Sequence, residues 1–142
     1  MNLCPCGGRG DPGARCSCSA QRLAHYRDKL SRALLDRFDL VVAMPRVRGV
    51  ELASTQGEAS DAVRTRVVAA RALLDSSSPK RDPEASDLLR NAVDRLHLSG
   101  RGHARVGRVA RTIAALAGAE TVRAEHVAEA LAYRSPDELR DV

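Results

Sequence analysis

Apolar residues recur at steps of three and four along the last two thirds of the chain, which is the spacing of an amphipathic helix. A polar stretch at 76–83 breaks the pattern. Ser99 and Thr121 are placed to cap helices, and Gly118 is placed to end one. Together these signals predict four helices, at residues 58–74, 84–96, 99–117 and 122–134. Four short helices joined by tight turns form a small bundle.

The same spacing identifies the side chains that we expect to face the core of this bundle. They are Val63, Val67, Ala70 and Leu74 in the first helix, Leu88, Leu89, Ala92, Val93 and Leu96 in the second, and Val106, Val109, Ile113 and Leu116 in the third.

The first 48 residues show a different pattern. Residues 1–18 are rich in Cys, Gly and Pro, a composition that forms a loop rather than a helix or strand. Ser19 can cap a helix over residues 19–35, because apolar residues again recur at helical steps. Residues 38–44, FDLVVAM, read as a short buried strand that ends at a proline, and 45–57 as a linker. The pattern therefore predicts one unit over 1–48 and a helical domain over 49–142.

Composition narrows the class of protein. The chain is 44% hydrophobic but only 2% aromatic, so Leu, Val, Ile and Ala on packed helices must fill the core. No apolar run is long enough to span a bilayer and no signal peptide is visible, so we expect a cytoplasmic protein.

The net charge of +5 lies in residues 1–48, which hold nine Lys and Arg against four Asp and Glu. This balance permits nucleic acid or nucleotide as a partner.

All four cysteines lie in the first 18 residues, as two C-x-C pairs: Cys4, Cys6, Cys16 and Cys18. Four thiolates around one tetrahedral Zn²⁺ would order a Gly- and Pro-rich loop that has little apolar surface of its own. Cross-paired disulfides, free thiols or another metal are the alternatives, although disulfides are uncommon in the cytoplasm and iron–sulfur sites usually have other spacings. The cluster predicts a structural zinc knuckle.

Arg37 stands in LLDRFDLVV, between a helix end and the predicted strand. An arginine held there can project toward a neighbouring subunit and stabilise charge on a transferring phosphoryl group. The alternative is an ion pair within the chain, to Asp36 or Asp39.

A second group of arginines opens the third bundle helix. Arg101, Arg105 and Arg108 fall within about 60° of one another around its axis. No acidic residue lies between Ser99 and Ala119, so a phosphate near the positive end of the helix dipole would offset their repulsion. A solvated basic face is the alternative.

Two motifs of nucleotide hydrolases are not found in the chain. No G-x-x-x-x-G-K-[ST] sequence is present, and no acidic pair follows an apolar strand. We therefore expect that the chain by itself neither binds nor hydrolyses a nucleotide.

Taken together, the segments NLCPCG, CSCS, LLDRFDL, GEASDAVRTRV, LHLSGRGHARVGRVARTIAALAG and HVAEALAYR resemble successive parts of Mg-chelatase-like AAA+ proteins of the ComM/YifB group. LLDRFDL is also similar to the arginine-finger segment of MCM helicases and of Mg-chelatase ATPase subunits. One departure is Leu3, where the group usually has proline.

The resemblance implies a role for each site residue. Asn2 would be sensor 1, which positions the attacking water, and Arg37 the arginine finger that acts on a neighbouring subunit. Arg101 would be sensor 2 and, with Arg105, would contact nucleotide. The fold would be mainly α: a four-helix AAA+ lid preceded by the zinc knuckle, one helix and one short strand from the end of the AAA+ core.

The same resemblance implies a C-terminal part of a hexameric ATPase that acts on DNA as a branch-migration helicase in competence, with ATP and Mg bound only by the full-length protein. Two alternatives are a zinc-containing nucleic-acid-binding module and a fragment of a true magnesium chelatase ATPase subunit. The cysteine knuckle argues against the chelatase subunit, because it is typical of the ComM/YifB group.

Overall fold

The computed structural model describes residues 2–11, 13–29, 31, 34, 37–42, 44, 47, 57–77 and 79–134. The chain divides into two compact units, Met1–Thr55 with Ser135–Val142, and Gln56–Arg134. The domain boundary expected at 48–49 lies outside the described residues. Within the described part, no helix is long and apolar enough to cross a membrane.

In the described part of the first unit, one helix is complete: α1, over Ala20–Arg27. The Ser19 hydroxyl accepts a hydrogen bond from the Arg22 N–H at 3.3 Å, which confirms the predicted N-cap. The helix is shorter than the expected 19–35, since it ends with Asp28 as its C-cap. None of its side chains is buried, so packing does not extend it beyond its local propensity. Leu34 is helical again, and most of its neighbours lie outside the described residues.

The strand predicted at 38–44 is not formed in residues 38–42 and 44, which the structure describes. The side chains of Phe38, Leu40, Val42 and Met44 are exposed, by 48% to 83%. A strand needs a neighbouring strand to pair its backbone groups, and the described residues pair strands only in the second unit. Residues 38–42 and 44 therefore do not form a strand, although their side chains favour one, because no described strand pairs with them.

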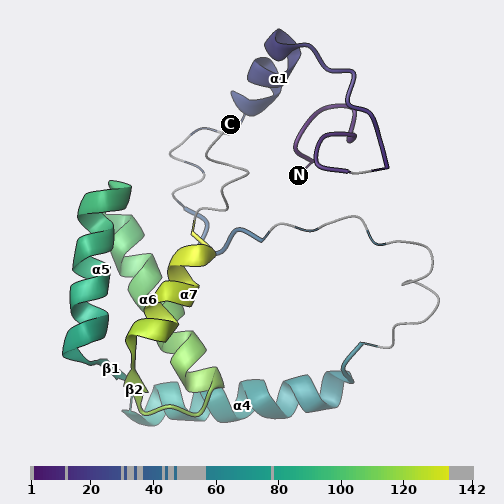
Figure 1. Ribbon diagram of the computed structural model, residues 1–142. Coiled ribbons are helices and arrows are strands. Elements are labelled where there is room, and N and C mark those ends of the chain that lie inside the picture. Colours follow the sequence, from purple (N-terminus) through teal and green to yellow (C-terminus); the bar gives the residue numbers. More distant parts are fainter. Residues whose placement is uncertain are drawn as a thin grey trace. The chain divides into compact units, whose positions relative to one another are not determined.

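The second unit contains the four predicted helices, which confirms a mainly helical chain (Figure 1). They are α4 over Ser60–Ser77, α5 over Pro83–Leu96, α6 over Gly100–Leu116 and α7 over Ala124–Ala132.

Side chains fix where these helices begin. The Asp82 carboxylate accepts the Ala85 N–H at 2.7 Å to start α5, and the Ser99 hydroxyl accepts the Gly102 N–H at 3.0 Å to start α6. Each such cap stabilises a helix by about 1 kcal/mol. Gly118, with φ of 69°, follows the end of α6 as predicted.

The start of α7 differs from the prediction. Thr121, expected as its cap, instead lies in strand β2, Thr121–Val122, which pairs in parallel with β1, Lys80–Arg81. The N-cap position belongs to Arg123, and its N–H donates to the Nδ1 atom of His126 at 3.0 Å. Two-residue strands leave no periodic signal in a sequence, so this pair was not predicted.

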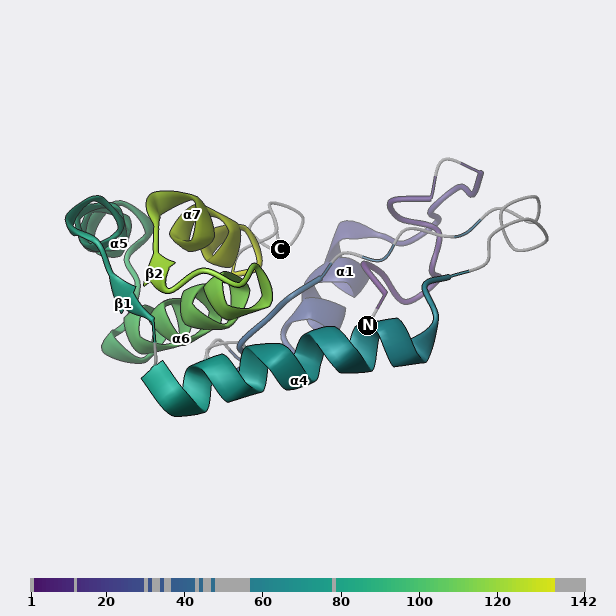
Figure 2. The ribbon, with the colours of Figure 1, turned by 90° about the horizontal axis from the view of Figure 1, so that it is seen from below.

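Helix α6 is the centre of the second unit. It contacts α4, α5, α7 and β2, and α4 packs against it (Figure 1, Figure 2). Small side chains dominate the buried cluster and permit close helix approach. Its members are Ala85, Leu89, Val106, Val109, Ala110, Ala114, Val122, Val127 and Ala130. Leu116, expected to face inward, is 41% exposed because it ends α6 beyond the edge of this core.

Leu89 and Leu116 give a direct test of this packing. Leu89 is 1% exposed, so Leu89→Ala removes buried contacts and we expect it to lower the free energy of unfolding by about 2 to 5 kcal/mol. Leu116→Ala makes the same chemical change at the edge of the core and should cost less than about 1 kcal/mol. Urea titration followed by helical circular dichroism measures both, and equal losses would contradict this description of the core.

Candidate functional site

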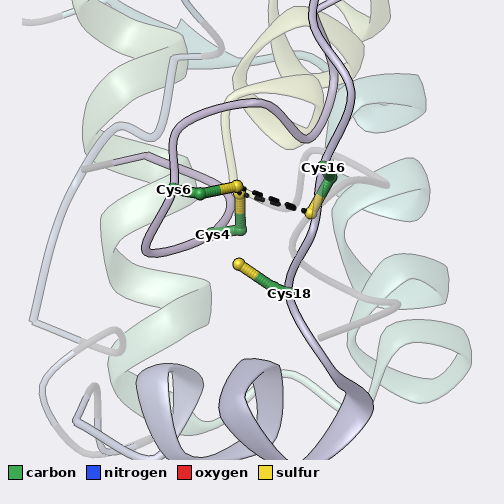
Figure 3. A group of neighbouring side chains, drawn as sticks. All are labelled: Cys4, Cys6, Cys16 and Cys18. Atoms are coloured by element: carbon green, nitrogen blue, oxygen red, sulfur yellow. Dashed lines mark hydrogen bonds between the residues drawn. The ribbon is translucent and has the colours of Figure 1, made fainter.

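The four cysteines of the first unit converge on one point (Figure 3). Their sulfur atoms all lie within 4.8 Å of one another, and all four are free cysteines. The sulfur of Cys4 lies 3.4 Å from that of Cys6 and 3.7 Å from that of Cys16, and the sulfurs of Cys6 and Cys16 are also 3.7 Å apart. The prediction that two distant C-x-C pairs form one cluster is confirmed.

These distances fit a single metal ion. A tetrahedral Zn²⁺ with bonds of about 2.3 Å separates its sulfur ligands by about 3.8 Å. The three sulfur–sulfur separations given above, from 3.4 to 3.7 Å, are close to that edge length. The cluster can therefore hold a metal ion with little movement of the chain.

Glycines allow the loop to close around the sulfurs. Gly7 and Gly10 have φ of 78° and 81°, a left-handed conformation that other residues rarely adopt. Gly8 is buried, and a Cβ placed on it would lie 3.0 Å from the carbonyl oxygen of Arg15. Only a residue without a side chain lets these two stretches approach so closely, so Gly8 is part of the site although it has no functional group. The sequence indicates glycines that let the loop turn, but not the close approach of Gly8 to Arg15.

The electrostatics of the cluster favour a negative sulfur at Cys6 and neutral sulfurs at Cys16 and Cys18. Hydrogen bonds from the backbone of Gly8 and of Ser17, and then from the thiols of Cys4 and Cys18, lower the pKa of Cys6 to about 6. Burial, followed by the neighbouring Cys6 thiol, raises the pKa of Cys18 to about 11. The thiolate of Cys6 is the form that Zn²⁺ or a similar soft ion binds, and the other sulfurs would also bind such an ion as thiolates.

Cys4 anchors the cluster to the loop. It is completely buried, and its sulfur accepts the N–H of Arg9 at 3.3 Å. Asn2 lies beside the same loop, with its Nδ2 atom 3.6 Å from the position that a Cβ of Gly7 would take. The Asn2 side chain is exposed, so its amide is accessible at the edge of the knuckle.

Arg37 lies at a turn that follows Leu34, and its N–H donates to the Leu34 carbonyl at 2.9 Å. Its side chain is exposed. A backbone fixed by a turn with an exposed side chain is compatible with a long cation that reaches outward.

The three arginines singled out in the second unit, Arg101, Arg105 and Arg108, lie in the first half of α6. Arg101 and Arg108 are exposed and Arg105 is half-buried, and the first turn of α6 contains no acidic residue. The open N–H groups of this turn add positive potential to that of the guanidinium groups. All three residues lie on α6, as the predicted helix required.

Arg134 joins this region from the end of α7. Its Nη2 atom lies 3.4 Å from the position of a Cβ on Gly102, within the first turn of α6. No spacing in the sequence brings residues 102 and 134 together, because their proximity depends on the packing of α6 against α7. Arg134 ends the segment HVAEALAYR, and no pattern in the sequence indicates a role for it.

The proposed residues thus form two groups. Asn2, Arg37 and the cysteines belong to the first unit, and Arg101 and Arg105 to the second. Each group is organised within its own unit.

Comparison with known proteins places both units in one family. Residues 1–52 match the family described as magnesium chelatase, subunit ChlI, and residues 76–134 match magnesium chelatase, subunit ChlI C-terminal.

Individual relatives agree with this result. The chain is similar to competence protein ComM of Haemophilus influenzae, at 36% identity over 82% of this chain and 26% of that protein. An uncharacterised protein of Mycobacterium tuberculosis is 38% identical over 94% of this chain and 30% of its own length. The uncharacterised protein YifB of Escherichia coli is 33% identical over 86% of this chain and 28% of its own length.

The chain therefore spans about 26% to 30% of the length of these relatives. The two family matches occur in chain order, the proposed arginines 37 and 101 fall one in each, and ComM and YifB are both among the relatives. The chain belongs to the magnesium-chelatase-like AAA+ ATPase family, in the ComM/YifB group.

Proposed function

We propose that this chain is the C-terminal portion of a hexameric AAA+ ATPase that acts on DNA, in the manner of a branch-migration helicase, and that it supplies an arginine finger and sensor 2 for ATP hydrolysis. The observation that carries the proposal is the order of the two family matches, with Arg37 in the first and Arg101 in the second. ATP and Mg²⁺ would be held by the full-length protein.

Arg37 would act on the nucleotide of a neighbouring subunit. A guanidinium group offers several N–H donors in a rigid plane, which suits the oxygens of a phosphoryl group in transfer. Its exposed position at a turn supports this role, because the side chain can extend beyond its own subunit. The competing role is an ion pair within the chain.

Arg101 would contact the γ-phosphate when the lid closes. In the described part of the chain it makes no ion pair or side-chain hydrogen bond, and it is exposed in the first turn of α6. The helix dipole and the guanidinium group both favour an anion there. Arg105, one turn further along, would support the same contact.

Asn2 would position the water that attacks the γ-phosphate. A carboxamide can accept a hydrogen bond from water and donate one to phosphate at the same time. Its exposed amide at the edge of the knuckle leaves both functions accessible.

The knuckle would have a structural role. Cys4, Cys6, Cys16 and Cys18 would all bind one zinc ion, so no coordination position would remain open for a substrate. The ion would cross-link the loop that leads from Asn2 to α1 and so fix where Asn2 lies.

A second candidate function is a zinc-containing nucleic-acid-binding module. The surplus of five basic residues in residues 1–48 favours it. The low aromatic content of 2% restricts such binding to phosphate contacts rather than base stacking.

Metal analysis tests the knuckle. The purified chain should contain one zinc ion per molecule by plasma mass spectrometry, and Cys16→Ser should lose most of it because three sulfur ligands bind far more weakly than four. Ser17→Ala changes an exposed side chain between two of the cysteines and should keep the metal. Equal zinc in both variants, or none in the unchanged chain, would contradict the knuckle.

Turnover in the full-length ATPase tests the arginines. Arg37→Ala should lower the rate of ATP hydrolysis by about 10³-fold or more while nucleotide binding stays nearly unchanged, because an arginine finger acts mainly in the transition state. Arg101→Ala should lower the rate as well. Arg22→Ala removes an exposed arginine of α1 and serves as the control. Normal turnover by Arg37→Ala would remove its proposed role.

A further inference from the structure

A basic groove lies between β1, the start of α5 and α6, within the second unit. It has a volume of about 550 Å³, and the polar and cationic residues that line it include Lys80, Arg81, Ser86, His103 and Arg111. We name it the β1–α6 groove. No carboxylate is among the described residues that line it.

Three cationic side chains line the groove. Among the residues that the structure describes, the side chains of Lys80, Arg81 and Arg111 make no ion pair and no side-chain hydrogen bond. The carboxylate nearest in sequence, Asp82, already accepts the Ala85 N–H at 2.7 Å as a helix cap. Like charges held around one hollow repel one another unless an anion lies between them.

Gly107 gives the groove its shape. It is a buried glycine in the middle of α6, where alanine would favour the helix. A Cβ at this position would lie 3.0 Å from the Nη1 atom of Arg81. The missing side chain therefore makes room for the Arg81 guanidinium group against the floor of the groove.

The groove is separate from the proposed nucleotide face of α6. His103, Gly107 and Arg111 follow one another at four-residue steps and share one strip of the helix. At 100° per residue, the centre of that strip lies roughly 125° around the axis from the centre of the strip of Arg101, Arg105 and Arg108. A phosphate in the groove would therefore not be the one that Arg101 contacts.

We propose that the β1–α6 groove binds backbone phosphates of a nucleic acid. This inference rests on the proposed action on DNA and adds to it the surface of contact. Arginine and lysine side chains are common ligands of phosphate, and the His103 ring adds a further hydrogen-bonding group. Among the described lining residues His103 is the one aromatic ring, so phosphate contacts rather than base stacking would dominate binding.

Fluorescence anisotropy with the 142-residue chain tests the inference. The probe is labelled oligothymidylate of about 20 nucleotides, longer than most single-strand sites. Arg111→Gln should weaken binding about fivefold to tenfold at low salt and reduce the salt slope by about one, as expected for one lost phosphate contact. Arg71→Gln on α4 removes another exposed arginine that has no partner among the described residues, and it should bind like the unchanged chain. Thermal unfolding checks that both variants are folded.

The other outcomes overturn the inference in distinguishable ways. Equal weakening by Arg111→Gln and Arg71→Gln would indicate attraction by overall charge rather than a groove. Unchanged binding by Arg111→Gln would remove the groove while leaving DNA binding by the chain in place. Loss of MgATP or inorganic phosphate binding without loss of oligothymidylate binding would make the ligand a free phosphate compound. No binding by the unchanged chain would overturn both the groove and the proposed action of this chain on DNA.

Discussion

Helix α6 packs against α4, α5, α7 and β2 with part of its surface and presents positive charge on the rest. The second unit depends on this division of the helix surface. Its buried positions are small, among them Gly102, Gly107, Ala110 and Ala114, so neighbouring elements approach its backbone closely. Its four arginines and complete lack of acidic residues leave the remaining surface positive. The same glycines admit guanidinium groups from elsewhere, Arg134 over Gly102 and Arg81 over Gly107. Packing and charge are therefore set by one run of residues.

The knuckle of the first unit also depends on a glycine that permits close approach, but the proposed interaction is metal–sulfur coordination. Gly8 lets two stretches of backbone approach closely, and this approach brings four sulfur atoms together instead of forming an apolar core. Since α1 buries none of its side chains, apolar packing contributes little to this described helix, and metal binding would contribute much to ordering the loop before it. In the proposed ATPase, one unit would then hold Asn2 and Arg37 near the nucleotides while the other carries Arg101 on a lid.

The sequence predicted what depends on local periodicity or local composition. The four bundle helices, the caps at Ser19 and Ser99 and the convergence of the cysteines all follow from such signals. It did not predict the β1–β2 pair or the positions of Arg81 and Arg134, because these come from contacts between distant segments. The strand at 38–44 failed for a related reason: apolar β-branched residues favour a strand, but only a partner strand can form one.

The most direct test of the account asks whether Arg37 acts across a subunit boundary. Full-length subunits with Arg37→Ala, which still bind ATP, would be mixed with subunits that keep Arg37 but carry a disabled nucleotide-binding loop. Each preparation alone should be inactive, and the mixture should regain ATP turnover, because an intact arginine then faces a neighbour's bound ATP. A mixture as inactive as its components, under conditions in which mixed rings assemble, would contradict the proposal that this chain completes the active site of another subunit.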